Sequence, residues 1–311
     1  MKILVYGAGV LGSLLASLMK RAGTDVSILA RGQRLREIEE KGIVIENLVS
    51  ETITTTPIET IKEKLSKETQ FDLIIVIMQK TQVHTILPDL ANFSTTATIL
   101  FVGNNGTAIE DYKDRINPNR ILLGFFSAGG MRQGHLMKVV FDPKVTRFYL
   151  GETSGDKTPR VKDIKLLLEK AGLNVIISEN IDSWLKTHIA WVSPLANLYY
   201  MLKKQTKELH ESSEEMEVAV QAVIEGVEVL KKLRYPILPE SFEQEIADLE
   251  VLKRKIILMF QWKWYDVVLK AHVEHGVDEM RKLADEFQIL IQKANIPTPN
   301  INKLYSYIPQ I

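Results

Sequence analysis

Three glycines close to the start of the chain are the residues whose type and spacing most directly indicate chemistry. Gly7, Gly9 and Gly12 follow an apolar run, Ile3 to Tyr6, and open a helical pattern, Val10 to Arg21. In such an arrangement the first glycine permits a tight turn, the second lets a pyrophosphate approach the backbone, and the third allows close helix–strand packing. The helix N-terminus then faces the phosphates. We expect a dinucleotide to bind at Gly7, Gly9, Val10, Leu11 and Gly12, with a plain strand–helix turn as the alternative.

The residue after the second apolar run, Val26 to Ala30, indicates which dinucleotide binds. NAD-binding chains commonly place Asp or Glu there, on the 2′-hydroxyl of the adenosine ribose. This chain instead has Arg31, with Arg34 three residues later. Because guanidinium groups bind phosphate oxygens in bidentate fashion, the sequence predicts NADP. The alternative is a solvated basic helix start, with Arg36 on the same surface.

The elements that must position these residues follow from the pattern of apolar runs. Up to about residue 178, short β-branched runs alternate with helical patterns, as expected for a parallel sheet. The runs are almost uninterrupted in Val, Ile and Leu, which is typical of strands covered on both faces. The sequence therefore predicts an α/β fold with a Rossmann-type doubly wound sheet. An antiparallel extension is expected near residues 131–150, and a last strand at Asn174 to Ser178.

The second part of the chain has a different pattern. After Asn180 glycine becomes rare, and apolar residues recur at three- and four-residue spacing, as between Met216 and Leu230. Ser241 is a candidate N-cap, and Pro297 and Pro299 separate a short terminal helix. We expect an NADP-binding Rossmann domain at 1–178 and an all-α substrate and catalytic domain at 179–311. No flexible spacer separates them, so we expect the domains to pack closely and form a cleft.

Composition excludes several function classes. The 311 residues carry 39 Lys and Arg against 39 Asp and Glu, so no overall charge attracts nucleic acid or a membrane surface. The absence of cysteine excludes disulfides, thiolate metal sites and a catalytic thiol. The longest apolar run, Leu73 to Met78, is too short to span a membrane, and the N-terminus lacks a signal-peptide pattern. We expect a cytoplasmic protein, with the choice between monomer and homodimer left open.

The order of several motifs along the chain resembles that of 2-dehydropantoate 2-reductase, the ketopantoate reductase family. The resemblance runs over nearly the full length. Its landmarks are the glycine motif, the arginine after the second strand, Gln79-Lys80-Thr81-Gln82, the Asn-Gly strand end at Gly103 to Gly106, Trp184-x-Lys186 and Glu279.

The resemblance implies roles for individual residues. Lys186 stands where the family has its catalytic lysine, which donates a proton to the alkoxide formed when hydride reaches a ketone carbon. Glu279 stands where the family has an acidic ligand for the substrate hydroxyl, and we group it with Lys186 as catalytic. Asn104, with Asn105 as the adjacent alternative, matches an asparagine near nicotinamide and substrate. Lys80 lies beside the position, Gln79, of a lysine that contacts the cofactor phosphate.

Departures from the family pattern concentrate in the substrate site. Asparagines expected four and eight residues after the lysine are replaced by Ala190 and Pro194, with Ser193 as a candidate substitute for the second. An Asn-Gly pair expected after the glutamate is replaced by Leu283-Ala284. We therefore expect reduction of a 2-oxo acid, ketopantoate to pantoate in pantothenate biosynthesis by resemblance, with bulkier and more apolar 2-oxo acids as alternative substrates. A non-catalytic NADP-binding regulatory protein of the same fold is the alternative from another class.

One further cluster could do chemistry. His272 and His275, with Glu274 between them, could place two imidazoles on one helical face. A metal site needs at least one further ligand, and none is evident from the sequence, so we predict no metal site.

Overall fold

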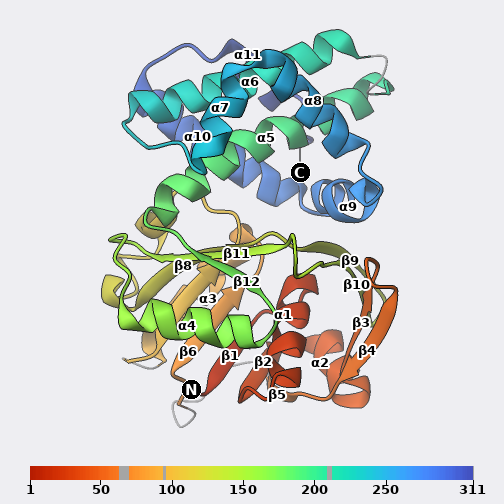
Figure 1. Ribbon diagram of the computed structural model, residues 1–311, viewed down its shortest axis with the longest axis vertical. Helices are drawn as coiled ribbons and strands as arrows, with labels where there is room; N and C mark the ends of the chain where they lie inside the picture. Colours follow the sequence, from red (N-terminus) through yellow and green to blue (C-terminus); the bar gives the residue numbers. More distant parts are fainter. Residues whose placement is uncertain (63–69, 94–95, 209–211, 311) are drawn as a thin grey trace. The chain divides into compact units, whose positions relative to one another are not determined.

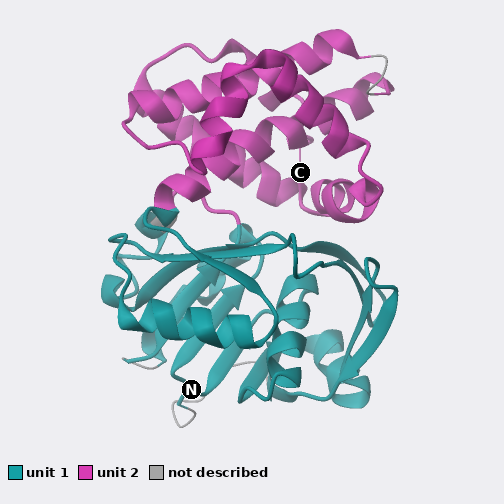
Figure 2. Ribbon diagram, in the orientation of Figure 1, with its two compact units in different colours: residues 1–103, 108–181 teal, residues 104–107, 182–311 magenta. Residues whose placement is uncertain are grey.

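The computed structural model describes residues 1–62, 70–93, 96–208 and 212–310, which form two compact units. The first unit comprises residues 1–103 and 108–181, and the second comprises 104–107 and 182–311 (Figure 2). The division therefore falls three residues beyond the boundary expected from sequence, and the short segment Asn104–Thr107 belongs with the second unit.

A large sheet forms the middle of the first unit (Figure 1). Its strand order is β12-β11-β8-β7-β6-β1-β2-β5, and the strands from β8 to β5 are parallel. The strands are β1 (Ile3–Tyr6), β2 (Val26–Ala30), β5 (Glu59–Lys62), β6 (Leu73–Ile77), β7 (Thr98–Val102), β8 (Ile121–Phe126), β11 (Arg147–Glu152) and β12 (Asn174–Ile177). The predicted parallel, doubly wound sheet is confirmed. The predicted antiparallel extension is confirmed as well, because β11 pairs antiparallel with β8 and parallel with β12.

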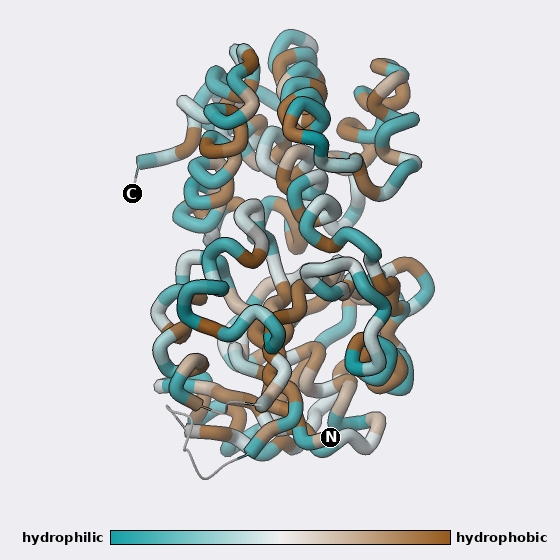
Figure 3. Tube along the Cα trace, turned by 90° about the vertical axis from the view of Figure 1, so that its left-hand side faces the viewer, coloured by the Kyte–Doolittle hydropathy of each residue, from teal (hydrophilic) through white to brown (hydrophobic). Residues whose placement is uncertain are grey.

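The core explains why these runs form the middle of the sheet. Every residue of β1, β2 and β6 is buried, so neither face of these strands meets water. Brown, hydrophobic stretches run through the interior of this unit in Figure 3, and residues of β1, β2 and β6 belong to its buried apolar cluster. The chain leaves β1 toward β2 on one side and continues through β6 on the other, so the strand order reverses at β1. Ligands of doubly wound sheets bind at the carboxyl ends of the strands at such a reversal.

A second sheet of four strands was not predicted as a separate sheet. Its order is β4-β3-β10-β9, with β3 (Ile43–Asn47), β4 (Thr52–Thr56), β9 (Gly129–Gln133) and β10 (Leu136–Val140). The turn expected near residue 134 does join two strands, β9 and β10, but β10 also pairs with β3, which in turn pairs with β4. Pairing partners more than 80 residues apart leave no local signal, which is why periodicity did not reveal this sheet.

Among its described residues, the first unit also has four α-helices and two 3₁₀ turns. The helices are α1 (Val10–Arg21), α2 (Gly32–Lys41), α3 (Lys80–Asn92) and α4 (Pro159–Lys170), and the turns are η1 (Ala108–Asp111) and η2 (Pro118–Arg120). α1 contacts both sheets, β1 and β2 of the large one and all four strands of the small one. Its bounds are those predicted, and Gly23 follows its end with a left-handed φ of 79°.

The second unit is helical, as predicted. Its helices are α5 (Ile181–Gln205), α6 (Ser213–Lys232), α7 (Glu240–Ala247), α8 (Leu249–Phe260), the π-helical turn η4 (Asp266–Lys270), α9 (Ala271–His275), α10 (Val277–Ala294) and α11 (Pro299–Tyr305). Ser241 lies inside α7 rather than at its N-cap, because Pro239 occupies that position. One buried apolar cluster joins α5, α6, α8, α10 and α11. No described helix is long and apolar enough to cross a lipid bilayer.

Candidate functional site

The turn between β1 and α1 has the geometry that its three glycines predict. Gly7 has a φ of 124°, and a Cβ atom there would lie 2.3 Å from the carbonyl oxygen of Ile77. A Cβ atom on Gly12 would lie 1.9 Å from the carbonyl oxygen of Gly7. Only Gly9 faces open space, with no heavy atom within 4 Å of its ideal Cβ position. Two glycines thus bring α1 against the strand ends, and the third leaves the backbone accessible.

The N-terminus of α1 is electrostatically suited to an anion. Gly9 is its N-cap and provides no side chain to bind the first amide groups, and the first turn has no acidic residue. Val10 and Leu11 direct their side chains toward the apolar core. Their amide groups are among the first four of the helix, which have no acceptor within it. The turn can therefore hold a pyrophosphate through backbone N–H groups and the positive end of the helix.

Arg31 lies at the end of β2, where the sequence predicts the 2′-phosphate contact. It is the exposed N-cap residue of α2, and its guanidinium donates a hydrogen bond of 2.7 Å to the hydroxyl of Tyr6. Burial raises the pKa of Tyr6, against the smaller effect of Arg31, so this hydroxyl is neutral at physiological pH. The single bond leaves other N–H groups of an exposed guanidinium able to bind a phosphate. Tyr6 was not singled out from sequence, because it is simply the last residue of a buried strand.

Arg34, the second arginine of this segment, has a structural role instead. It is 7% exposed and donates hydrogen bonds to the carbonyl oxygen of Ala8, the hydroxyl of Ser13 and the carbonyl oxygen of His135. It also pairs with Glu37 at 3.3 Å. Arg34 therefore ties α2 to the glycine turn and α1, whereas Arg31 has an exposed side chain.

Lys80 is the first residue of α3, which follows β6, the strand next to β1. Its side chain is 2% exposed, and its ammonium lies 2.6 Å from the carboxylate of Asp111 and 5.3 Å from the centroid of the Tyr112 ring. Tyr112 in turn stacks on Phe101 of β7 at 4.0 Å. Asp111, which the sequence did not single out, fixes the position of Lys80 at the carboxyl ends of β6 and β7.

In the second unit, Lys186 is buried on α5 rather than exposed. Its exposed fraction is 4%, and its ammonium forms an ion pair with Asp182 one helical turn earlier. The same ammonium lies 4.7 Å from the centroid of the Tyr235 ring. Burying a charge without a partner is unfavourable, so the carboxylate and the ring face are what allow an ammonium here. The four-residue spacing from Asp182 was visible in the sequence, whereas Tyr235 was not identifiable.

Glu279 lies in the first turn of α10 and is 3% exposed. Its carboxylate is 3.5 Å from Nε2 of His272, a residue of α9. The structure thus excludes the solvated helix face that the neighbouring acidic residues left open as an alternative. A buried carboxylate beside an imidazole can accept a hydrogen bond from a substrate hydroxyl.

His188 lies on α5, two residues after Lys186. Its ring stacks on Trp184 at 5.4 Å, with 8° between the ring planes. Burial, with a smaller contribution from His272, lowers the pKa of His188 to about 4. His188 is therefore neutral at physiological pH. Thr187 is committed elsewhere, because its hydroxyl donates to the carbonyl oxygen of Ser183 and accepts from the amide of Leu238.

The segment Asn104–Thr107 is held in the second unit by α10. The amide of Gly106 donates a hydrogen bond of 3.1 Å to Glu286, which is 2% exposed. The side chain of Asn105 accepts from both the amide and the hydroxyl of Thr107, so it shapes the turn. Asn104 is half-buried, and its Oδ1 has no hydrogen-bond partner within the part of the chain described. Asn104 rather than Asn105 is therefore the asparagine whose side chain is available to a ligand.

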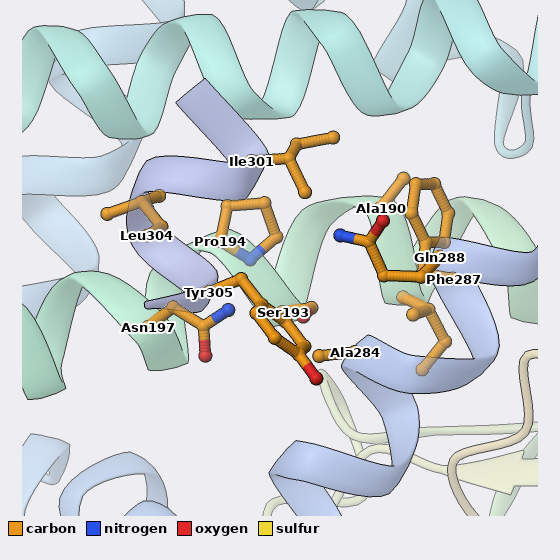
Figure 4. A pocket seen from close by; sticks show the side chains of 11 residues that line it. Ala190, Ser193, Pro194, Asn197, Ala284, Phe287, Gln288, Ile301, Leu304 and Tyr305 are labelled. Carbon is orange, nitrogen blue, oxygen red and sulfur yellow. The ribbon is translucent and has the colours of Figure 1, made fainter. Parts of the chain in front are cut away.

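Most of the positions at which this chain lacks the polar residues of the family line one pocket of the second unit. Ala190, Ser193, Pro194 and Ala284 all line it, and Asn197 joins them from α5 (Figure 4). Leu283 is fully buried in the helical core.

The histidine pair near the end of the second unit is divided between different contacts. Nδ1 of His275 is 2.8 Å from the carbonyl oxygen of Ala271, while His272 faces Glu279. Glu274 binds Lys203 at 2.7 Å and also Tyr199. Among the residues that the structure describes, no group of three His, Asp or Glu is placed to hold a metal ion.

A glycine-rich turn at the reversal point of a doubly wound sheet, followed by a helical unit with a buried lysine, defines a Rossmann-type oxidoreductase. Residues 3–154 match the family model described as Ketopantoate reductase PanE/ApbA. The curated 2-dehydropantoate 2-reductase of Pyrococcus horikoshii is 24% identical over 85% of each chain. That of Nostoc sp. is 23% identical over 98% of this chain and 93% of the relative. The chain belongs to the ketopantoate reductase family.

Solved structures show the same fold over the whole length. A putative ketopantoate reductase from Ralstonia solanacearum covers 99% of this chain and 96% of its own, with a TM-score of 0.79 and 16% identity. A D-mandelate dehydrogenase, solved with NADH and anilino(oxo)acetate, covers 99% of this chain and 97% of its own, with a TM-score of 0.77 and 17% identity.

Proposed function

We propose that this chain is an NADPH-dependent reductase that converts a 2-oxo acid to a 2-hydroxy acid. The observation that carries the proposal is the buried Lys186–Asp182 ion pair, in a chain whose first unit has an accessible glycine turn at the ends of its strands. The curated relatives named 2-dehydropantoate 2-reductase support ketopantoate as substrate and a role in pantothenate biosynthesis. The lack of cysteine supports action in the cytoplasm.

The cofactor is NADP, whose reduced form, NADPH, would supply hydride to the substrate carbonyl and leave as NADP⁺. The open space at Gly9 and the free amide groups of α1 fit its pyrophosphate, and Arg31 fits its 2′-phosphate. Lys80 would contact the phosphate of the cofactor, and Asn104 would contact the nicotinamide. Because a hydrogen bond to a charged group contributes about 1.5–3 kcal/mol, Arg31→Ala is expected to remove most of the preference for NADPH over NADH. Fluorescence titration of both cofactors measures this, and equal affinities in the unmutated protein would contradict it.

The residues of the second unit handle the substrate. The ammonium of Lys186 stabilises the negative charge that develops on the carbonyl oxygen and donates the proton that completes the hydroxyl. Asp182 orients this ammonium. After the proton transfer, the neutral amine takes up a proton from solvent, and the carboxylate of Asp182 favours this charged form. Glu279 accepts a hydrogen bond from a substrate hydroxyl, and Asn104 and Ser193 bind the substrate through their polar side chains.

A 2-oxo acid other than ketopantoate is the second candidate substrate. It is favoured by Ala190 and Pro194, which have no side-chain hydrogen-bonding group where the family has asparagines. Under this alternative the chemistry at Lys186 is unchanged, and only the side chain of the substrate differs.

The experiment that tests the proposal follows NADPH oxidation through the loss of absorbance of the reduced nicotinamide. The panel contains ketopantoate and branched, aromatic and long-chain 2-oxo acids. We expect turnover on at least one of them. NADPH binding without turnover on any member would instead identify a dinucleotide-binding regulatory protein of the same fold.

A further inference from the structure

A hydrogen bond joins the exposed Arg31 to a buried residue of the neighbouring strand. Tyr6 is the last residue of β1 and only 1% exposed, and its hydroxyl accepts the bond of 2.7 Å from the Arg31 guanidinium. The central carbon of that guanidinium lies 5.9 Å from the centroid of the Tyr6 ring, within the range of a cation–π contact. One buried phenol therefore contacts the arginine through its oxygen and its ring.

The register of the two strands explains why these side chains meet. β1 and β2 are parallel neighbours in the large sheet (Figure 1), and Tyr6 pairs with Leu29. Arg31 keeps an extended backbone, with a φ of −132°, so its side chain leaves the same face of the sheet as those of Leu29 and Tyr6. The residues of the other face, such as Val5 and Ile28, belong to the apolar cluster that includes α1. The hydroxyl of Tyr6 can therefore be removed without changing the packing of α1.

A phenol holds an arginine in position without cancelling its charge. Three other arginines of the first unit, Arg34, Arg132 and Arg160, pair with carboxylates. Arg31 has no ion pair among the residues that the structure describes, and its partner is neutral because burial raises the pKa of Tyr6. The full positive charge of Arg31 and its other N–H groups thus remain available to a phosphate.

We propose that Tyr6 is a positioning residue that sets the preference of this protein for NADPH over NADH. The inference rests on the proposed function, in which Arg31 binds the 2′-phosphate. An arginine side chain has many rotamers, and immobilising it on binding weakens the affinity for the ligand. The bond to Tyr6 holds the guanidinium before the cofactor arrives, so less freedom is lost when the 2′-phosphate binds. NADH has no 2′-phosphate and gains nothing from this bond. Because Tyr6 is 1% exposed, it acts through Arg31 rather than on the cofactor itself.

The test compares the dissociation constants of NADPH and NADH in the unmutated protein and in Tyr6→Phe, which removes only the hydroxyl. Fluorescence titration measures both. We expect the Kd of NADPH to rise about five- to ten-fold and the Kd of NADH to change by less than about two-fold. Tyr149→Phe is the matched control, because it removes a half-buried phenol hydroxyl from β11, toward the other end of the same sheet. Both dissociation constants should stay unchanged in this control.

A double-mutant cycle distinguishes positioning from a general structural effect. Arg31→Ala leaves no guanidinium to position, so adding Tyr6→Phe to it should change the Kd of NADPH by less than about two-fold. The role of Tyr6 is overturned if Tyr6→Phe weakens NADPH by the same factor with and without Arg31. An equal rise of the NADPH and NADH dissociation constants in Tyr6→Phe also overturns it, because Tyr6 then only supports the fold.

The same titrations separate this inference from the proposed function. A preference for NADPH that is unchanged in Tyr6→Phe overturns the role of Tyr6 and leaves the proposed function intact. Equal affinities for NADPH and NADH in the unmutated protein overturn both the NADP assignment and the role of Tyr6. If NADPH is preferred but no 2-oxo acid is reduced, the proposed reaction fails, and the role of Tyr6 is still decided by the cycle. Tyr6→Leu replaces Tyr6→Phe if thermal unfolding shows that the latter does not fold.

Discussion

Lys186 combines a charge with burial, and the residues around it explain how both persist. A lysine on an amphipathic helix is ordinarily exposed, because its ammonium is strongly hydrated. Here Asp182 and the face of the Tyr235 ring take the place of that water. An ammonium held in this way is close to fixed in position, which is what proton delivery to a developing alkoxide requires.

We therefore predict that Lys186→Ala lowers turnover by about 10²- to 10⁴-fold while NADPH affinity stays nearly unchanged. Lys270→Ala is the matched control, since Lys270 pairs with Asp266 at the same four-residue spacing but is exposed. Steady-state kinetics and cofactor titration measure the two effects separately. Unchanged turnover in Lys186→Ala would remove Lys186 from the mechanism.

His188 gives a prediction about pH rather than catalysis. Its pKa is lowered to about 4 in the folded protein, against an ordinary value of 6.5. Between these values the unfolded chain binds a proton that the folded protein does not, so the free energy of unfolding increases as pH rises from 4 to 6.5. Over this whole pH range the group changes the free energy of unfolding by up to about 3 kcal/mol. Urea unfolding at several pH values should show a flatter dependence in His188→Gln, and parallel curves would contradict the assignment.

At the scale of elements, the β1–α1 turn assigns different roles to its glycines. Gly12 has no room for a Cβ atom, since the carbonyl oxygen of Gly7 would be 1.9 Å away, whereas Gly9 faces open space with a φ of −72°. We predict that Gly12→Ala destabilises the fold by at least about 2 kcal/mol. Gly9→Ala is expected to cost less than about 1 kcal/mol of stability.

The same pair of variants separates folding from cofactor binding. In Gly9→Ala the added methyl group occupies the approach to the backbone, so NADPH affinity should fall by about ten-fold or more in a protein that still unfolds cooperatively. Thermal unfolding and fluorescence titration on both variants supply the comparison. Wild-type NADPH affinity in Gly9→Ala would mean that the pyrophosphate does not lie on this turn.

The elements that sequence could predict are those with a local signature. β1, α1 and β2 follow from uninterrupted apolar runs, a glycine turn and a stop at Gly23, and the structure reproduces their bounds. β3 and β4 alternate buried and exposed residues only weakly, and β3 pairs with β10, which lies far away in the chain, so periodicity did not identify them. In the site, Lys186 and Glu279 were identified from the order of the family motifs along the chain. Their neighbours Tyr235 and His272 are brought to them by tertiary packing alone, which the motifs do not indicate.

At the scale of the whole molecule, the proposed function divides the work between the two units. It assigns dinucleotide binding to the glycine turn of the first unit and the substrate to the buried charges of the second. The segment Asn104–Thr107 follows β7 of the first unit but is bound to α10 through Glu286. The predicted cleft between two domains stays a prediction, and so do the cofactor and substrate contacts that depend on it.

The last prediction concerns which 2-oxo acid the whole molecule prefers. Ala190, Pro194 and Ala284 line the pocket where hydrogen-bonding side chains are expected of the family, and each lost contact is expected to cost about 1–3 kcal/mol of transition-state binding. The free-energy changes at neighbouring positions need not add, because residues in contact can compensate for one another. Ser193 is the polar residue that lies among these positions.

We predict that kcat/KM with NADPH is higher for larger, more apolar 2-oxo acids than for ketopantoate, because apolar walls tolerate them better. Ala190→Asn, which restores a family amide, should shift the ratio toward ketopantoate. A large preference for ketopantoate in the unmutated protein, at about 10⁴ M⁻¹s⁻¹ or above, would mean that Ser193 and Asn197 replace the missing asparagines in full.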